Sequence, residues 1–304
     1  MVDSLKLRMA ELIDPTLRPE RIASGFGFTE GPLWRPDQSL LFSDMPQDKR
    51  RRWHARTGVT VERAESNKCN GMTIDNAGAL IVCEHSTSSV VREGTDGSRV
   101  VLADRWNGRE LNSPNDVIVA NDGAVLFTDP AFGRMPVFGV QRPLELDFCG
   151  VYRVTRAGNL QLLADDFGQP NGLCLSPDES RLYVNDTEHA HIRSFHYDPN
   201  GELSDGRIFA DGITEVEDNS DGFVDGMKVD ELGNVYVSGP GGIWIFDQTG
   251  EKLGVIEVPE KVANFNWGGS DWQTLYITAS TSIYRIRTRV RGNQLGYMRR
   301  SLGA

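Results

Sequence analysis

The chain has 304 residues, enough for one large domain or two small ones. Its 32 Lys and Arg residues are outnumbered by 43 Asp and Glu residues. The resulting net charge of −11 argues against a nucleic-acid partner, because phosphate binding needs a concentrated basic surface. No apolar run approaches the roughly 18 residues that span a membrane, so no membrane-spanning segment is expected.

The first segment, residues 1–20, is expected to form an N-terminal extension, with an amphipathic helix over residues 4–13. Charged residues run through this segment without the apolar core of a secretory signal, so a cytoplasmic location is expected. Widely spaced cysteines fit reduced thiols in that compartment; they are Cys69, Cys83, Cys149 and Cys174. Residues 21–304 are expected to form a single domain.

That domain is built from a repeated phrase in which an acidic or amide residue precedes a short apolar strand. A turn rich in Gly, Asp or Asn follows, and a second strand begins ten or eleven residues after the polar residue. The phrase occurs six times, at intervals of 39 to 56 residues. Its first residues, called the anchors below, are Glu30, Asn70, Asn115, Asn171, Asp225 and Asn264.

Each repeat also contains third and fourth strand-like segments, and four short strands per unit of about 40–50 residues are typical of a β-propeller. The sequence therefore predicts an all-β fold with six blades. A β-sandwich is the rival fold, but the repetition of the anchor position disfavours it. The last unit lacks one strand after residue 286, and residues 21–25 are expected to supply it, closing the ring and covering two sheet edges.

In a propeller, the first strand of every blade lines the central channel, so the anchors are expected to form a ring at one mouth. Every anchor offers a side-chain oxygen, and the two carboxylates give the ring a charge of −2. Oxygen ligands of this kind suit a hard divalent cation such as Ca²⁺, which takes 6–8 oxygens. At any single position, capping of a turn is an equally good explanation. Three or four anchors are expected to ligate one ion.

Polar residues at the ends of the second strands should surround the same mouth, because these strands run back towards it. We single out Asp129 for a functional role, possible second-metal binding included, although an Asp that caps a turn before Pro130 is the alternative. His85 is a candidate pocket residue. There is no G-x-S-x-G or H-E-x-x-H motif. The full set at these strand ends is Asp44, Glu84, His85, Asp129, Asn185 and Asp186.

Several phrases resemble those of the senescence marker protein/gluconolactonase/luciferin-regenerating enzyme family, also called regucalcin-like, and are most similar to those of its bacterial gluconolactonase-type members. The resemblance extends over about residues 21–286. The order of the E-G-P, P-N-G and D-G-M motifs makes it specific. The matching segments are 28–34 (FTEGPLW), 109–116 (RELNSPND), 127–130 (FTDP), 169–173 (QPNGL) and 225–230 (DGMKVD).

The resemblance implies a six-bladed propeller with one divalent ion, for which Ca²⁺ is the first candidate. It implies that Glu30, Asn171 and Asp225 are metal ligands and that Asn115 binds the metal or the substrate. Arg109 and Asn112 match a segment that reaches the substrate in some members. The repeat alignment adds Asn70 and Asn264 as pocket residues. These candidates, together with His85 and Asp129, make up the expected substrate contacts.

The resulting hypothesis is a hydrolase of small lactones, such as the aldonolactone glucono-1,5-lactone. The metal would act as a Lewis acid, and Asp225 would act as general base or, alternatively, as nucleophile. A phosphotriesterase or another esterase using the same site is one alternative, although residues 264–269 lack the histidine of phosphotriesterase-type relatives. A calcium-binding propeller without turnover is another.

Overall fold

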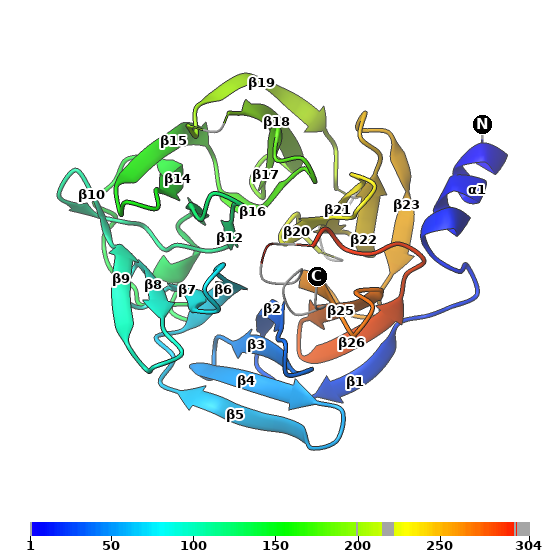
Figure 1. Cartoon of the computed structure of the whole chain (residues 1–304), viewed down its shortest axis with the longest axis horizontal. Coiled ribbons are helices and arrows are strands. Elements are labelled where there is room, and N and C mark those ends of the chain that lie inside the picture. The colour runs from blue at the N-terminus through cyan, green and yellow to red at the C-terminus, as the bar shows by residue number, and fades with distance from the viewer. Residues whose placement is uncertain (1, 199, 215–221, 295, 297–304) are drawn as a thin grey trace.

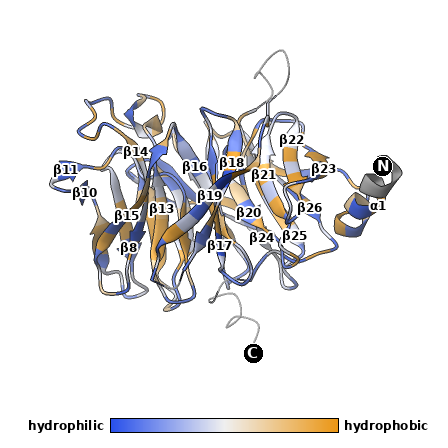
Figure 2. Cartoon of the chain, turned by 90° about the horizontal axis from the view of Figure 1, so that it is seen from above, coloured by the Kyte–Doolittle hydropathy of each residue, from blue (hydrophilic) through white to orange (hydrophobic). Residues whose placement is uncertain are grey.

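The computed structural model describes residues 2–198, 200–214, 222–294 and 296. Six four-stranded sheets are found among these residues, arranged as blades around a central axis (Figure 1). Figure 2 shows the ring edge-on, with the strands running between its two faces. The predicted all-β propeller with six blades is therefore confirmed. No helix in the described part of the chain is long and apolar enough to cross a membrane.

The first three blades follow one another in sequence, and each is an antiparallel sheet whose first strand is innermost. Blade 1 contains β2 (Thr29–Trp34), β3 (Leu40–Asp44), β4 (Lys49–His54) and β5 (Gly58–Ala64). Blade 2 contains β6 (Cys69–Ile74), β7 (Leu80–Glu84), β8 (Ser89–Glu93) and β9 (Arg99–Ala103). Blade 3 contains β12 (Val117–Val119), β13 (Val125–Asp129), β14 (Cys149–Val154) and β15 (Leu160–Phe167).

The second half of the ring repeats this order. Blade 4 contains β16 (Pro170–Leu175), β17 (Arg181–Asp186), β18 (His191–Tyr197) and β19 (Leu203–Ala210). Blade 5 contains β20 (Met227–Val229), β21 (Val235–Gly239), β22 (Gly242–Phe246) and β23 (Lys252–Glu257). Blade 6 contains β24 (Val262–Gly268), β25 (Thr274–Ala279), β26 (Ser282–Arg287) and the N-terminal strand β1 (Glu20–Ser24).

Strand β1 is the outermost strand of blade 6, which is the position expected for residues 21–25. It pairs antiparallel with β26, with Glu20 opposite Arg285 and Ser24 opposite Ser282. Arg285 Nε also donates a hydrogen bond of 2.8 Å to the Glu20 carboxylate. The pairing covers the edge of β26. That this pairing is what keeps the ring closed stays a prediction.

The core lies between neighbouring blades. Every residue of the inner strands β2, β6 and β16 is buried, whereas the outer strand β5 is mostly exposed. An inner strand packs against blades on both sides, so both of its faces are apolar or engaged in hydrogen bonds. Aromatic pairs join adjacent blades: Trp34 of blade 1 stacks on Tyr276 of blade 6 with ring centroids 4.6 Å apart.

Three elements lie outside the repeat. Helix α1 (Val2–Leu12), expected over residues 4–13, packs outside the ring against β23 (Figure 1). Arg8 Nη1 donates a hydrogen bond of 2.9 Å to Glu251. The sequence pattern did not predict the hairpin of β10 (Arg105–Trp106) and β11 (Arg109–Glu110), or the 3₁₀ turn η1 (Phe132–Arg134).

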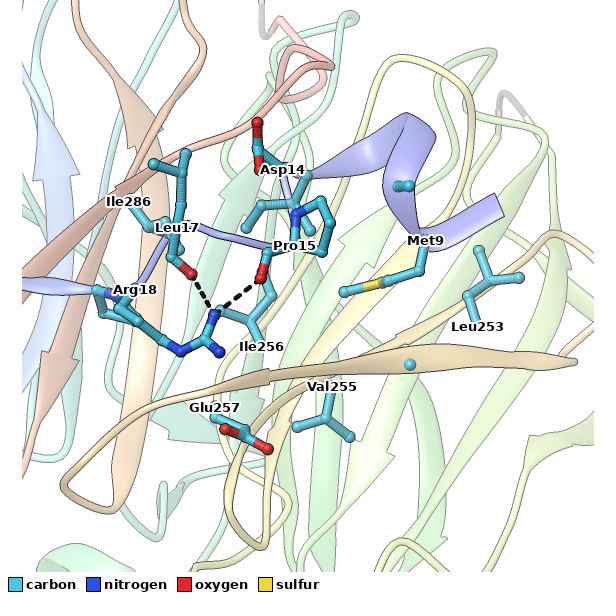
Figure 3. Close-up of a pocket in the computed structure, with 14 residues that line it drawn as sticks. Met9, Asp14, Pro15, Leu17, Arg18, Leu253, Val255, Ile256, Glu257 and Ile286 are labelled. Atoms are coloured by element: carbon cyan, nitrogen blue, oxygen red, sulfur yellow. Dashed lines mark hydrogen bonds between the residues drawn. The ribbon is translucent and has the colours of Figure 1, made fainter. Parts of the chain in front are cut away.

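A groove of about 690 Å³ lies between residues 9–19 and the strands β23 and β26 (Figure 3). Its lining is largely aliphatic, and Arg18 Nη1 is occupied by the carbonyl oxygens of Pro15 and Leu17, at 2.9 and 2.8 Å. The groove is larger than the channel cavity described below. It brings together no set of carboxylate and amide oxygens among the described residues, so it is not the candidate site.

The segment 288–294 covers one end of the channel. The Asn293 N–H donates to the carbonyl of Val229 at 3.0 Å, and the Glu231 N–H donates to the carbonyl of Arg291 at 2.9 Å. Gly292 lies against Trp267, where an added Cβ would approach the indole to 2.5 Å. A void of only about 50 Å³ is left beside Lys228 and Asn293. The opposite end holds the anchors.

Candidate active site

The anchors meet at one end of the channel, around a cavity of about 360 Å³. Asn264 does not line this cavity. The four anchors of blades 1 to 4 on its wall are at most 4% exposed, and Asp225 is half-buried. The repeat thus brings five of the six predicted oxygens together. The anchors that line the cavity are Glu30, Asn70, Asn115, Asn171 and Asp225.

Glycine after the anchor lets neighbouring blades approach backbone to backbone. The Gly71 N–H donates to the carbonyl of Asn115 at 2.8 Å, and the Gly172 N–H donates to the carbonyl of Asp225 at 3.0 Å. A Cβ added to Gly172 would lie 2.4 Å from the same Asp225 oxygen. Larger residues would therefore push the anchors apart.

Polar side chains near the ends of the second strands hold the anchors of the next blade. Ser43 Oγ donates to the Asn70 carbonyl at 2.7 Å, and Thr128 Oγ1 donates to the Asn171 carbonyl at 2.7 Å. In blade 4, Asn185 Nδ2 takes this role and donates to the carbonyl of Asp225 at 2.5 Å. Blades 1, 3 and 4 thereby fix the backbone position of the next blade's anchor.

Three anchor oxygens are buried without any hydrogen-bond partner: Glu30 Oε1, Asn70 Oδ1 and Asn171 Oδ1. The amide nitrogen of Asn171 is engaged, because it donates to Thr187 Oγ1 at 3.1 Å, and Thr187 in turn donates to the Val224 carbonyl at 2.6 Å. Leaving a buried polar atom unpaired costs about 1–3 kcal/mol. Three such oxygens on one small cavity indicate a ligand that accepts their lone pairs.

His85 orients the amide of Asn70. Its Nδ1 lies 3.0 Å from the Phe138 carbonyl, which can only accept, so Nδ1 carries the proton. Nε2 is then an acceptor for Asn70 Nδ2 at 3.2 Å. Burial lowers the pKa of His85 to about 4, so the ring is neutral at pH 7. This arrangement leaves the oxygen of Asn70, rather than its nitrogen, unpaired.

The pKa values of both anchor carboxylates are raised. Burial and the nearby Asp116 raise the pKa of Glu30 to about 7. Burial, followed by the charge of Glu30, raises the pKa of Asp225 well above its ordinary value. Like charges in a poorly solvated site repel, and a cation between them would favour both ionised forms. The electrostatics therefore agree with the unpaired oxygens.

Asn264 lies behind Glu30. Its Nδ2 donates to Glu30 Oε2 at 3.1 Å, and Oε2 also accepts the Gly31 N–H. Asn264 Oδ1 accepts the N–H of Phe265 at 2.8 Å and lies 3.4 Å from Lys228 Nζ. Asn264 thus fixes one oxygen of Glu30 and leaves the other free.

Three predicted substrate residues lie away from the cavity wall. Arg109 is exposed on the β10–β11 hairpin and lies 3.6 Å from Asp147. Asn112 donates to the carbonyls of Asp129 and Phe148 at 3.1 and 2.8 Å. Asp129 is fully buried, and burial raises its pKa to about 7.

The carboxylate of Asp129 binds backbone: its oxygens accept the N–H groups of Asn112 and Ser113 at 2.8 and 2.7 Å. Blades 1 and 4 repeat this arrangement. Asp44 accepts the Gly27 N–H at 3.0 Å, and Asp186 accepts two backbone N–H groups ahead of its blade's anchor. The acidic residue after these strands therefore holds the segment that leads into the anchor.

Asp186, His189 and His191 form a second group whose potential ligand atoms lie within 4.8 Å of one another. His189 Nδ1 lies 2.8 Å from Asp186 Oδ2. The Asp186 carboxylate also accepts the N–H groups of Gly168 and Gln169, at 2.8 and 3.0 Å. These bonds explain its position without a metal ion.

Two features of the channel were not predicted. Lys228 Nζ lies 3.4 Å from Asp116 Oδ2, below the anchors. Asp116 and Lys228 both lie in copies of the repeated phrase. A charged residue within a segment predicted to line the channel is the sequence signal that could have identified them. The second feature is a group of apolar side chains on the cavity wall, partly from a long connection that no other blade repeats. They are Phe28, Met45, Phe132, Met135, Phe138 and Phe223.

The sequence and the fold have counterparts among known proteins. A family model described as the SMP-30/Gluconolactonase/LRE-like region matches residues 28–281. The gluconolactonase of Zymomonas mobilis is 33% identical over 304 residues, covering 94% of this chain and 85% of that protein. The pentonolactonase of Haloferax volcanii is 30% identical over 260 residues, covering 83% of this chain and 81% of that protein.

Two solved structures share the fold of this chain. A gluconolactonase from Xanthomonas campestris superposes with a TM-score of 0.84 at 34% identity and covers 92% of both chains. A calcium-binding protein, regucalcin, from Agrobacterium tumefaciens superposes with a TM-score of 0.74 at 18% identity, covering 92% of this chain and 98% of that one. The second likeness concerns the fold alone.

Proposed function

The chain belongs to the SMP-30/gluconolactonase/LRE-like family, and on that premise we propose that it is a lactonase that hydrolyses sugar lactones with one divalent metal ion. The observation that carries the proposal is the set of unpaired, buried oxygens on the channel cavity. The gluconolactonase and pentonolactonase relatives support the choice of reaction.

The metal would be held by Glu30, Asn171 and Asp225, with Asn115 as a further ligand or a substrate contact. This donor set is entirely oxygen, as hard cations such as Ca²⁺ prefer, and its two carboxylates match a double positive charge. When bound, the ion supplies a Lewis acid for the lactone carbonyl. Asn70, oriented by His85, offers its oxygen to the ion or to a substrate hydroxyl.

Asp225 is proposed to handle the proton. In hydrolysis, water adds to the carbonyl carbon, the bond between that carbon and the ring oxygen breaks, and a hydroxy acid forms. Asp225 accepts the proton of the attacking water and delivers one to the departing ring oxygen. Direct attack by the Asp225 carboxylate on the carbonyl carbon is the alternative. Asn112 and Asp129 serve this chemistry indirectly, by fixing the segment that carries Asn115.

Metal removal tests the proposal. Protein stripped with a chelator should release acid from glucono-1,5-lactone no faster than the spontaneous hydrolysis in buffer, and added Ca²⁺ or another divalent ion should restore turnover. Binding has a separate readout, because a ligand at 100 times its Kd stabilises the folded state by about 2.7 kcal/mol. Glu30→Gln should reduce the metal-induced rise in melting temperature.

The same experiment separates the rival functions. Turnover that persists in protein shown by elemental analysis to be metal-free would overturn the metal-dependent mechanism. A metal-induced rise in melting temperature without turnover on any lactone would identify a calcium-binding propeller instead. Hydrolysis of phosphotriesters alone would identify the esterase alternative.

A further inference from the structure

The cavity has two unlike walls. The anchors present oxygens on one side, whereas apolar side chains dominate the rest of the described lining. Three of these side chains come from the connection between β13 and β14, here called the 131–142 segment. The apolar group consists of Phe28, Met45, Phe132, Met135, Phe138 and Phe223, with Val262 and Ala263 beside it.

The 131–142 segment is held in place by its own contacts. Its backbone turns on itself, with the Gly139 N–H donating to Met135 at 2.8 Å and the Val140 N–H donating to Gly133 at 2.9 Å. Gly139 lies so close to Gly133 that a Cβ would be 1.7 Å from the Gly133 oxygen. Arg134 also donates to the Leu111 carbonyl at 2.7 Å. The aromatic wall is therefore a fixed surface.

The segment also contacts the neighbouring blades. Phe138 meets Phe28 of blade 1 edge to face, with ring centroids 5.1 Å apart and planes at 62°. Lys68 Nζ donates to the carbonyl of Val137 at 3.0 Å. The carbonyl of Phe138 orients His85, as described above. The apolar wall and the oxygen ring are thus built around the same residues.

Apart from the anchors, four polar side chains line the described wall: His85, Thr187, Ser280 and Lys261. Both nitrogens of His85 are engaged, and the Thr187 hydroxyl is engaged by Asn171 and Val224. Ser280 and Lys261 lie at the same wall. Lys261 Nζ is 5.9 Å from the centre of the Phe223 ring. A fully hydroxylated lactone would bury hydroxyls against carbon, which costs free energy unless they find partners.

We propose that the cavity prefers lactones with an apolar substituent over fully hydroxylated aldonolactones. The carbonyl faces the anchors, and the substituent packs against Phe28, Phe132 and Phe138. This inference rests on the proposed lactonase function and ranks its substrates, placing lactones with an apolar substituent ahead of the aldonolactones. The reaction is unchanged: water adds to the carbonyl, and the ring oxygen leaves with a proton.

The test compares two six-membered lactones on the metal-loaded full chain: glucono-1,5-lactone, and δ-octalactone, which carries a propyl group in place of the hydroxyls. Each kcat/KM is divided by that lactone's hydroxide-catalysed rate, because the two rings differ in intrinsic reactivity. The normalised value should be at least about tenfold higher for δ-octalactone, since one buried methylene is worth a severalfold gain. A higher value for glucono-1,5-lactone would overturn the proposal.

If neither lactone is opened, the lactonase function itself fails. Glucono-1,5-lactone still hydrolyses without enzyme, so binding is then compared by surface plasmon resonance with freshly dissolved compounds. A lower Kd for glucono-1,5-lactone than for δ-octalactone would overturn the preference independently of the reaction.

Variants locate the preference on the wall. Phe138→Asn should lower the ratio of the two kcat/KM values about tenfold, mainly through the KM of δ-octalactone. Phe132→Ser provides a second route if Phe138→Asn does not fold. Val137→Ser is the matched control, because Val137 lies in the same segment with its side chain 56% exposed and outside the cavity lining. An unchanged ratio in both phenylalanine variants, or an equal fall in Val137→Ser, would contradict the assignment.

Discussion

The two ends of the channel use the same inner strands in opposite ways. At the anchor end, buried oxygens of Glu30, Asn70 and Asn171 have no partner. At the other end, Lys228 lies between Asp116 and Asn264, at 3.4 Å from an oxygen of each, and also donates to the Met227 carbonyl at 3.0 Å. The segment 288–294 covers that end, whereas the anchor end opens into a cavity.

Within one repeated motif, the polar groups at the open end therefore serve function, whereas those at the covered end serve stability. Polar groups that are paired at the covered end contribute to holding the blades together. Unpaired groups at the open end weaken the fold until a ligand satisfies them, and such strain is typical of functional sites. Substitutions at the two ends should therefore have opposite effects on turnover and on stability.

The largest effect is expected for Asp225→Asn at the open end. Loss of the proton acceptor should lower the turnover of glucono-1,5-lactone by about 100-fold or more. The melting temperature of the metal-free protein should stay level or rise, because Glu30 loses a repelling neighbour. Initial rates and thermal unfolding check the two parts. Asp211→Asn makes the same charge change at an exposed position, and full activity in Asp225→Asn would exclude its assigned role.

Lys228→Met at the covered end should instead lower stability more than turnover. Asp116 would be left buried without its cation, and breaking such a pair costs about 3 kcal/mol. Urea unfolding measures the loss of stability. The turnover of the folded variant should change less, in free-energy terms, than its free energy of unfolding. The double variant Lys228→Met/Asp116→Asn should recover much of it. A single variant as stable as the parent would show that the ion pair contributes nothing.

The smallest effect is expected for Gly292→Ala. The new methyl group would meet Trp267 at 2.5 Å, and overpacking of this kind costs about 1–3 kcal/mol, with turnover unchanged. Gly172→Ala makes a similar clash at the open end, 2.4 Å from the Asp225 carbonyl oxygen, and should lower both stability and turnover. Equal turnover in Gly292→Ala and Gly172→Ala would contradict the assignment of function to the open end and of stability to the covered end.

Much of this architecture could be predicted because it is repeated. One hairpin register fixes where the anchor lies in every blade, so the alignment of six phrases gave the propeller and the five oxygens on the cavity. The same repeat misleads about Asp129. An acidic residue at the end of a second strand reads as a pocket residue, whereas the structure engages both of its oxygens with the Asn112 and Ser113 backbone.

The apolar wall could not be predicted in this way. Phe132 and Phe138 lie in a connection that no other blade repeats, and their position depends on tertiary contacts such as the packing of Phe138 on Phe28. Similarly, the sequence pattern placed Asn264 on the ring, but a hydrogen bond to Glu30 turns it away from the cavity. Contacts between side chains of different blades cannot be predicted from the spacing of residues within one repeat.

The pairing of β1 with β26 has a consequence for how the chain is made. Glu20 and Arg285 are 265 residues apart in sequence. During translation, the other sheets can assemble while β1 is still unpaired, because its partner β26 has not yet left the ribosome. Contacts this distant in sequence slow folding. The nascent protein therefore carries an unpaired β1 until β26 has emerged, and an unpaired strand edge can associate with other chains during that interval.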